Sequence, residues 1–254
     1  MAIKGVLLDL GGVLYVGRQA LPGAADALVR LRKHGLPLRF LTNTTRSTRR
    51  AVAGRLKRMA FVIAEEEIFT APAAALDEIR RRALRPYLLI HPDLAPELES
   101  VETEPPNAVL VGDAGEAFTY ERMNRAFRLV ADGAPLLAMS RARYFREDDG
   151  LSLDAGPFVA ALEYAAGVEA EVLGKPAPGF YRAAVAALGC RPEATVMVGD
   201  DVEADVHGAV DAGLQGLLVR TGKYRPGDER VLGDRGEAAD DLAAAVDWII
   251  ARAS

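Results

Sequence analysis

The sequence is nearly free of cysteine and carries no excess of basic charge. Cys190 is the single cysteine among 254 residues, so no internal disulfide can form, and a reducing cytoplasm is the expected compartment. The net charge of -5 and the pI near 5.4 argue against a general affinity for nucleic acid or anionic membranes, because both need a basic field. We therefore expect neither as a partner.

Long hydrophobic runs are also lacking. The longest apolar run near the start, residues 6–16, is interrupted by Asp9 and by Gly11 and Gly12. It is well short of the ~20 residues that span a bilayer, and no signal peptide is recognisable. The sequence predicts a soluble protein.

What is present is the composition of an ordinary globular protein, with 50% hydrophobic and 26% charged residues. Its length allows one large domain or two smaller ones. Strand and helix patterns alternate along the chain, which is typical of βαβ units around a parallel sheet. We predict an α/β fold, in which a Rossmann-like doubly wound parallel sheet forms the core and a smaller α/β domain is inserted into it.

Apolar runs bounded by turn residues predict strands at residues 5–10, 36–42, 68–70, 87–90, 108–111, 136–139, 195–198 and 216–219. Amphipathic patterns predict helices at residues 24–33, 48–59, from 72 onward, 120–131, 157–166, 180–188, up to 212, and 240–252. Residues 141–150 are expected to form a loop.

The composition of the chain changes after about residue 85, where prolines cluster around two further predicted strands. This change predicts an inserted domain. We place a first core segment at residues 1–75, the inserted domain at 76–170, and a second core segment at 171–254.

Asp9 stands at the end of the first predicted strand. Gly11 and Gly12 follow it and let the backbone approach a ligand closely. In an open α/β sheet, ligands bind outside the carboxyl ends of the strands, so this position favours a functional acid. A simple turn acid is the alternative.

A second acidic group follows the predicted strand 195–198, with Asp200, Asp201 and Asp205 inside six residues. These carboxylates repel one another unless a cation or hydrogen-bond donors gather them. Together with Asp9 they indicate a site for a hard metal ion. The alternative is a solvated acidic start of a helix, which the helix dipole favours.

Two further loops contain candidate phosphate-binding residues. Thr42 and Asn43 end the second predicted strand before a helix, where they either cap the helix or hold a phosphate at its N-terminus. Lys175 lies in a Gly-Lys-Pro turn and is weak evidence by itself.

Residues 109–113 end in Val-Gly-Asp, as does the predicted strand before Asp200, and Glu116 follows three residues after Asp113. Because this copy lies in the inserted segment, we assign it to substrate recognition or to a domain surface.

The order of Asp9, Thr42, Lys175 and Asp200–Asp201, each at a strand end or adjoining loop, resembles the four motifs of the haloacid dehalogenase superfamily, and the resemblance covers the whole chain. The insert resembles its C2-type cap, as in class IIA members. Segments 85–91, 113–120, 174–178 and 220–226 resemble a branch that hydrolyses phosphohistidine, phospholysine and inorganic pyrophosphate.

The resemblance implies a role for each matching residue. Asp9 would be the nucleophile that accepts the phosphoryl group, and Lys175 would assist it by offsetting repulsion from an anionic substrate. Substrate contacts are implied for Asp9, Leu10, Gly11, Thr42, Asn43 and Lys175. Mg²⁺ is the implied cofactor, with Asp9, the Gly11 carbonyl and Asp200 as protein ligands and with Asp201 and Asp205 supporting them. The resemblance also implies a phosphorylated small molecule or protein as substrate and makes a homodimer plausible.

One position departs from the superfamily pattern. Most of its phosphatases carry a second aspartate two residues after the nucleophile, as general acid and base, and here that residue is Gly11. General acid–base help is typically worth ~10² to 10⁴ in rate. Its absence favours substrates with good leaving groups, such as P–N and phosphoanhydride bonds. It also leaves open a catalytically weak phosphate-binding or regulatory protein with the same fold.

Overall fold

A computed structural model of the chain describes residues 2–147 and 150–253. The described residues form two compact units. One comprises the residues up to Thr42, Arg50–Phe69 and the residues from Lys175 onward. The other comprises Asn43–Arg49 and Thr70–Gly174. The sequence placed the domain boundaries after residues 75 and 170, whereas these units divide after residues 69 and 174 and assign the short segment 43–49 to the inserted unit.

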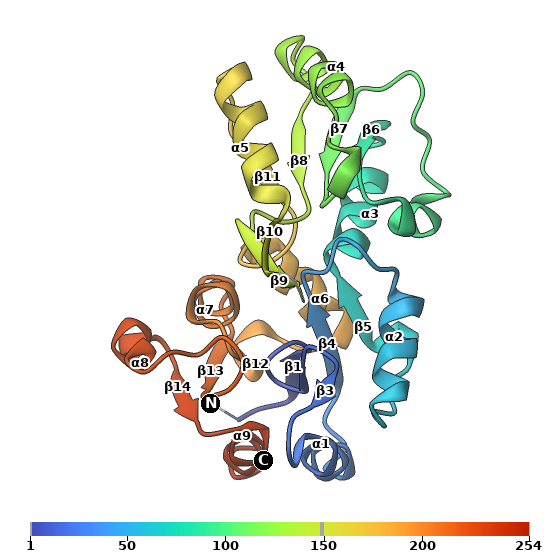
Figure 1. Cartoon of the computed structure of the whole chain (residues 1–254). Coiled ribbons are helices and arrows are strands. Elements are labelled where there is room, and N and C mark those ends of the chain that lie inside the picture. The colour runs from blue at the N-terminus through green and yellow to red at the C-terminus, as the bar shows by residue number, and fades with distance from the viewer. Residues whose placement is uncertain (1, 148–149, 254) are drawn as a thin grey trace. The chain divides into compact units, whose positions relative to one another are not determined.

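The first unit contains a six-stranded sheet in the order β14-β13-β12-β1-β4-β5 (Figure 1). Its strands are β1 (Gly5–Asp9), β4 (Leu38–Thr42), β5 (Ile68–Thr70), β12 (Thr195–Gly199), β13 (Gln215–Val219) and β14 (Glu237–Ala239), and a small ribbon pairs β2 (Tyr15–Val16) with β3 (Gln19–Ala20). The pairs from β14 through β4 are parallel. The predicted α/β class with a doubly wound parallel sheet is confirmed.

The strand order reverses beside β1. Along the chain, β4 lies on one side of β1, whereas β12 lies on the other side, followed by β13 and β14. Such a reversal is a topological switch point, and the crevice outside the carboxyl ends of the strands there is where open α/β sheets bind ligands. The last residue of β1 is Asp9, opposite Leu41 of β4.

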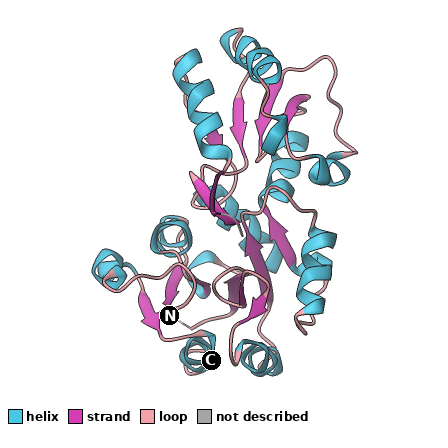
Figure 2. Ribbon diagram, in the orientation of Figure 1, coloured by secondary structure: helices cyan, strands magenta, loops and turns pink. Residues whose placement is uncertain are grey.

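The helices of this unit are α1 (Ala24–Lys33), α2 (Arg49–Arg58), α6 (Pro178–Leu188), α7 (Gly208–Asp211), α8 (Asp228–Leu232) and α9 (Leu242–Ile250) (Figure 2). Short 3₁₀ turns occupy Glu65–Glu67, Pro192–Ala194 and Gly233–Arg235, and a π-helix, η5, runs over Val202–His207. Within the described ranges, no helix combines the length and the apolar character needed to cross a membrane.

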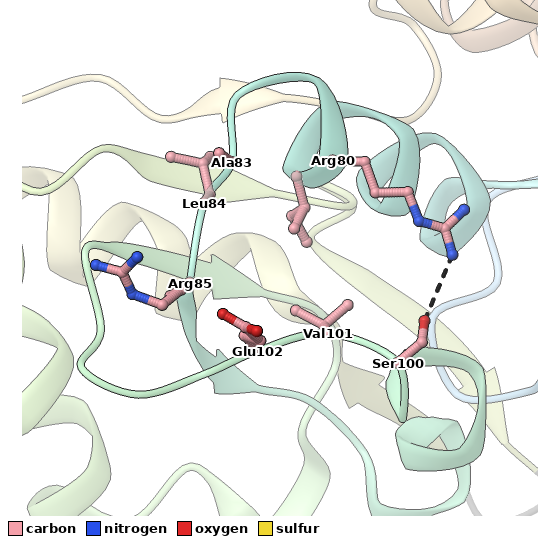
Figure 3. Close-up of a pocket in the computed structure, with 8 residues that line it drawn as sticks. Arg80, Ala83, Leu84, Arg85, Ser100, Val101 and Glu102 are labelled. Carbon is pink, nitrogen blue, oxygen red and sulfur yellow. Dashed lines mark hydrogen bonds between the residues drawn. The ribbon is translucent and has the colours of Figure 1, made fainter.

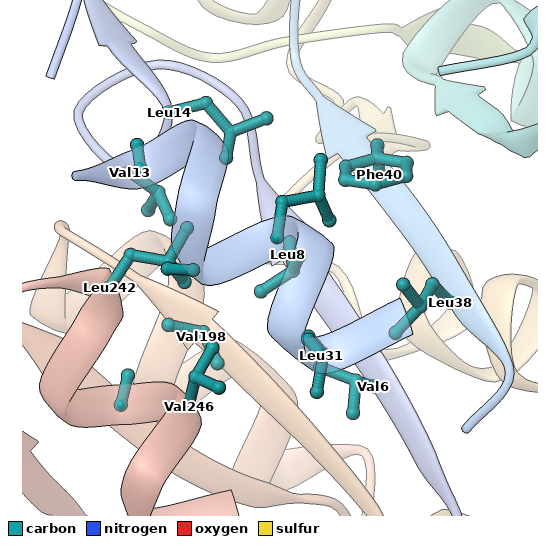
Figure 4. Packing of buried hydrophobic residues seen from close by; sticks show 14 of the residues in the cluster. Val6, Leu8, Val13, Leu14, Leu31, Leu38, Phe40, Val198, Leu242 and Val246 are labelled. Carbon is teal, nitrogen blue, oxygen red and sulfur yellow. The ribbon is translucent and has the colours of Figure 1, made fainter. Parts of the chain in front are cut away.

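The core of the first unit is built on alternate strand residues. Val6 and Leu8 of β1 pack with Phe40 of β4 and Leu31 of α1 in one apolar cluster, and Val246 of α9 completes it (Figure 4). Because side chains alternate between the two faces of a strand, the buried Leu7 faces the opposite side of the sheet, and α6 contacts β1. Both faces are therefore covered, as a parallel sheet requires.

The second unit has a four-stranded parallel sheet in the order β11-β8-β7-β6. Its strands are β6 (Pro86–Leu89), β7 (Ala108–Val111), β8 (Leu136–Ala138) and β11 (Glu171–Val172), its helices α3 (Ala71–Arg81), α4 (Tyr120–Ala131) and α5 (Ala155–Ala166), and its 3₁₀ segments Pro92–Leu98 and Gly115–Ala117. One apolar cluster joins α3 and the segment Pro92–Leu98 to the sheet, and another joins α4 and α5 to it. The inserted α/β domain is thus present as predicted.

Two local predictions are wrong. The expected loop at residues 141–150 contains strand β9 (Tyr144–Glu147) and the first residue of β10 (Gly150–Leu153), which pair antiparallel. Such a two-stranded ribbon has little apolar periodicity, so its sequence does not distinguish it from a loop. The single helix expected up to residue 212 is instead the π-helix η5 followed by α7. π-helical turns occur often at functional sites.

Replacing Phe40 by alanine tests the core directly. Phe40 is fully buried, so Phe40→Ala is expected to lower the free energy of unfolding by about 3–5 kcal/mol. Val62 is 88% exposed, and Val62→Ala should change that free energy by less than about 0.5 kcal/mol. Urea denaturation of both variants checks this, and equal effects would contradict the packing described.

Candidate active site

The carboxylates predicted from two strand ends lie together in the first unit. Asp9 ends β1, Asp200 follows β12, and Asp205 lies in η5. Each is at least 93% buried, and one oxygen from each lies within 4.8 Å of the others. Because β1 and β12 are adjacent parallel strands, their carboxyl ends meet at the same edge of the sheet.

Lys175 lies between two of these carboxylates. Its Nζ donates to Asp9 Oδ1 at 2.5 Å and to Asp205 Oδ1 at 2.6 Å, and the lysine side chain is 94% buried. Asp205 uses its second oxygen to accept the backbone N–H of Asp201 at 3.2 Å. Asp205 therefore fixes the ammonium group beside Asp9.

Asp200 and Asp201 have different partners. Asp200 Oδ2 accepts the backbone N–H of Lys223 at 2.6 Å. Asp201 Oδ1 accepts the N–H of Ala204 at 2.9 Å and so caps η5, and its Oδ2 accepts from Lys223 Nζ at 3.2 Å. Asp200 points into the buried cluster, whereas Asp201 holds the start of the π-helix.

Three glycines allow the chain to approach these acids. A Cβ on Gly12 would lie 1.8 Å from Asp200 Oδ2, and a Cβ on Gly222 would lie 2.0 Å from the same atom. A Cβ on Gly199 would lie 2.2 Å from that of Asp205. Gly12 and Gly222 also have φ values of +79° and +60°, which side chains disfavour.

The electrostatics of the cluster follow from its burial. Burial raises the pKa of Asp9 to about 6, although Lys175 opposes this shift. Burial also raises the pKa of Asp200 to about 7, and repulsion from Asp9 and Asp205 adds to it. Burial disfavours the charge of Lys175, but Asp205 and Asp9 outweigh it and raise the pKa of the lysine. Ionising Asp9 and Asp200 together is therefore unfavourable in this cluster unless a further cation is present.

This donor set fits a divalent metal ion. Three buried carboxylates offer hard oxygen ligands within reach of one centre, and Asp200 pairs with no cationic side chain in the contacts above. Mg²⁺ prefers such oxygen ligands and usually retains several waters. Asp9 and Asp200 are the two acids best placed to hold it, because Asp205 already accepts hydrogen bonds at both oxygens.

The other residues predicted to bind substrate follow directly after β1 or lie at the end of β4. Thr42 ends β4, one residue beyond the partner of Asp9 in the register, and Leu10 donates its N–H to Leu41 at 3.2 Å. Asn43 is the first residue of the second unit. A Cβ on Gly11 would have a single neighbour within 4 Å, Asp9 Oδ2 at 4.0 Å. The backbone at Gly11 therefore has room for a side chain.

The acidic copy at the end of β7 lies in the second unit. Asp113 is buried and pairs with Arg46, whereas Glu116 is exposed. His91 Nδ1 accepts the N–H of Asp93 at 3.2 Å and caps the segment Pro92–Leu98. A hydrogen-bonded structural role thus accounts for His91.

A cavity of about 320 Å³ lies in the second unit (Figure 3). It is lined by Ile79, Arg80, Ala83, Leu84, Arg85, Ser100, Val101 and Glu102. None of these is a candidate catalytic residue, so we do not assign the chemistry to this cavity.

Sequence reasoning missed Lys223 as a neighbour of the acidic cluster. Segment 220–226 resembles the family, but Lys223 lies more than twenty residues after Asp200 in the sequence, so no local pattern indicates their contact. The glycine at position 222 was the available signal, since a glycine beside a lysine after a buried strand permits close backbone approach.

Two family models match the chain. A haloacid dehalogenase-like hydrolase model matches residues 6–104, and a HAD hydrolase-like model matches residues 172–245.

Curated relatives and solved structures agree with these models. The chain is 46% identical to the phospholysine phosphohistidine inorganic pyrophosphate phosphatase of Xenopus laevis, over 98% of this chain and 95% of that protein. It is 48% identical to the haloacid dehalogenase-like hydrolase domain-containing protein 2 of Bos taurus, over 90% and 88%. Its fold matches the glycerol phosphate phosphatase of Mycobacterium tuberculosis, solved in complex with magnesium, with a TM-score of 0.85 and 29% identity over 95% of this chain and 76% of that one.

These matches span both core segments and the inserted domain. The chain belongs to the haloacid dehalogenase superfamily of hydrolases and is a phosphatase of that superfamily.

Proposed function

We propose that this phosphatase depends on Mg²⁺, acts through a phosphorylated Asp9 and favours P–N and phosphoanhydride bonds over alkyl phosphates. The buried cluster of Asp9, Lys175 and Asp200 supports the chemistry. The substrate preference depends on one observation, the glycine at position 11, two residues after the nucleophile.

Asp9 is suited to attack phosphorus. A carboxylate oxygen would form a bond to phosphorus while the bond to the leaving group breaks, and the leaving group departs with the electron pair. Lys175 touches Asp9 and lowers the repulsion between this carboxylate and an anionic phosphoryl group. Water would then attack phosphorus, release phosphate and restore the carboxylate. Phosphoryl transfer needs such positioning and charge neutralisation more than other covalent machinery.

Other residues of the chain would hold the substrate and the metal. Thr42, Asn43 and Lys175 are proposed to bind phosphoryl oxygens, with Leu10 and Gly11 contributing backbone atoms. Asp9, the carbonyl of Gly11 and Asp200 are proposed to hold Mg²⁺, with Asp201 and Asp205 as support. When bound, Mg²⁺ would neutralise phosphoryl charge and orient the phosphoryl group toward Asp9.

The leaving group decides which substrates react without an acid at position 11. An alkyl phosphate releases an alkoxide, which is about as basic as hydroxide and therefore leaves poorly without a proton. Phosphohistidine that is protonated by solvent at its other ring nitrogen releases neutral imidazole, a good leaving group because its conjugate acid has a reference pKa of about 6.5. Pyrophosphate leaves as an anion that a bound cation stabilises.

The relatives support both parts of the proposal. The Xenopus relative is named for phospholysine, phosphohistidine and pyrophosphate, and the mycobacterial phosphatase was solved with magnesium. We propose a phosphorylated small molecule, or a protein carrying phosphohistidine or phospholysine, as substrate. The cytoplasmic location and the homodimer expected from the sequence stay predictions.

Replacing the nucleophile tests the chemistry. Asp9→Asn should abolish Mg²⁺-dependent phosphate release from pyrophosphate and phosphohistidine, because the amide cannot attack phosphorus. Asp211, an exposed acid of the same unit that pairs with Arg235, provides the control, and Asp211→Asn should retain activity. Phosphate release is measured with both substrates. If neither the variants nor the wild type release phosphate, yet the wild type binds phosphate, a phosphate-binding protein becomes the better interpretation.

Restoring a carboxyl group tests the leaving-group argument. Gly11→Asp fits the space at this position and should raise kcat/KM for alkyl phosphates by about 10²-fold, the lower end of general acid–base catalysis. Gly11→Ala, which adds only the Cβ, should not. Rates on phosphohistidine should change much less. An unchanged rate of Gly11→Asp on alkyl phosphates would refute the argument.

Metal binding should be visible without catalysis. At a Mg²⁺ concentration of about 100 times Kd, binding adds about 2.7 kcal/mol of stability, or roughly 5–10 °C in Tm for a chain of this length. Asp200→Asn should remove most of this increase, and Asp211→Asn should keep it. Thermal unfolding of EDTA-treated protein with and without Mg²⁺ measures the effect; an equal increase in Asp200→Asn would exclude Asp200 as a ligand.

A further inference from the structure

Asp113 is a buried acid that the proposed chemistry does not use. It follows β7 and is 3% exposed, and its partners lie within the second unit. Arg46 Nε donates to Asp113 Oδ2, Arg46 Nη2 lies 3.4 Å from Oδ1, and the N–H of Gly115 donates to Oδ1 at 3.0 Å. A buried carboxylate with these donors is held firmly, because removing one partner would leave charge unpaired.

The partners of Asp113 come from the segment 43–49, which directly follows Thr42. The N–H of Asp113 donates to the buried Thr45 Oγ1 at 3.0 Å, and the Arg46 guanidinium also lies over the Phe145 ring, 4.5 Å from its centroid. At the far end of the segment, Arg49 Nε donates to Glu97 Oε1 at 2.7 Å. The second unit therefore fixes this segment at two places.

The first residue of the segment, Asn43, also packs within the second unit. A Cβ on Gly174 would lie 2.8 Å from Asn43 Oδ1 and 2.3 Å from the carbonyl oxygen of Met139. Asn43 thus lies directly against the residue that precedes Lys175. The chain leaves the first unit after Thr42 and returns to it at Lys175. The neighbouring residues Asn43 and Gly174 both belong to the second unit.

We propose that Asp113 is a positioning residue for the reaction. Through Arg46 and Thr45 it fixes the conformation of segment 43–49 and thereby the place of Asn43 in phosphoryl binding. This inference rests on the proposed function, because it assigns Asn43 to the phosphoryl group. Asp113, at the second Val-Gly-Asp strand ending, would then have a role different from that of Asp200. In its described hydrogen bonds Asp113 contacts segment 43–49 and Gly115, and no candidate metal ligand.

The effect expected is on binding, with less effect on turnover. Asp113→Asn keeps the shape and one acceptor but loses the charge that holds Arg46. Hydrogen bonds to charged groups have strengths that correspond to about tenfold in an equilibrium constant. We expect about a tenfold rise in KM for pyrophosphate and in Kd for inorganic phosphate, with a smaller change in kcat. Arg46→Gln should act in the same way, and the double variant should be no worse than either single one.

The experiment measures phosphate binding by calorimetry with Mg²⁺ present, and pyrophosphate kinetics, on the full chain. Glu163→Gln is the matched control: Glu163 is also a largely buried acid of the second unit, paired with Arg141 at 2.7 Å and with the N–H of Ala170. It should leave KM and Kd unchanged. Thr45→Val, which removes the acceptor of the Asp113 N–H, gives a second route if Asp113→Asn fails to fold.

The outcomes separate this inference from the proposed function. Normal wild-type turnover with unchanged KM and Kd in both Asp113→Asn and Thr45→Val would overturn the positioning role and leave the function standing. Equal weakening in Glu163→Gln would also overturn it, because general loss of stability would then explain the effect. Weaker phosphate binding in Asp113→Asn without turnover in wild type would support the positioning role and reject hydrolysis.

Discussion

The structure of the site depends on one constraint, the burial of three carboxylates beside one lysine. Taking charges out of water is costly unless each is paired. Lys175 pairs with Asp9 and Asp205, while Asp200 accepts a backbone N–H. Burial raises the pKa of Asp200, and repulsion from Asp9 and Asp205 adds to this rise. Such a group of hard oxygen donors suits a divalent cation, and this is the physical basis of the proposed Mg²⁺ site.

The fold creates this cluster through ordinary rules of parallel sheets. The switch point next to β1 brings the ends of β1 and β12 together, and glycines at positions 12, 199 and 222 let the backbone approach the acids. Gly11 differs from these three, because it has room for a side chain. Sterics therefore do not require glycine there, and the proposed preference for good leaving groups rests on the carboxyl group that this position does not supply.

The sequence predicted the features that depend on local pattern. Asp9 and Asp200 were found because buried strands are short apolar runs and their ends are marked by turn residues. Lys223 and the partnership of Asp113 with Arg46 were not found, because each joins residues far apart in the chain and no local pattern encodes such contacts. The ribbon of β9 and β10 and the π-helix at Asp205 were missed because neither has a distinct periodicity. The sequence thus indicated which acids gather at the edge of the sheet but not what holds them in place.

The most direct test of the account is to detect phosphorylation of Asp9 during turnover. The protein would be mixed with a stoichiometric amount of pyrophosphate and Mg²⁺, quenched in acid within the first turnover, digested and examined by mass spectrometry. The account predicts that the peptide containing Asp9 gains the mass of one phosphoryl group and loses it on longer incubation. Phosphate release without a modified Asp9 at any time, or a phosphoryl group on another residue, would contradict it.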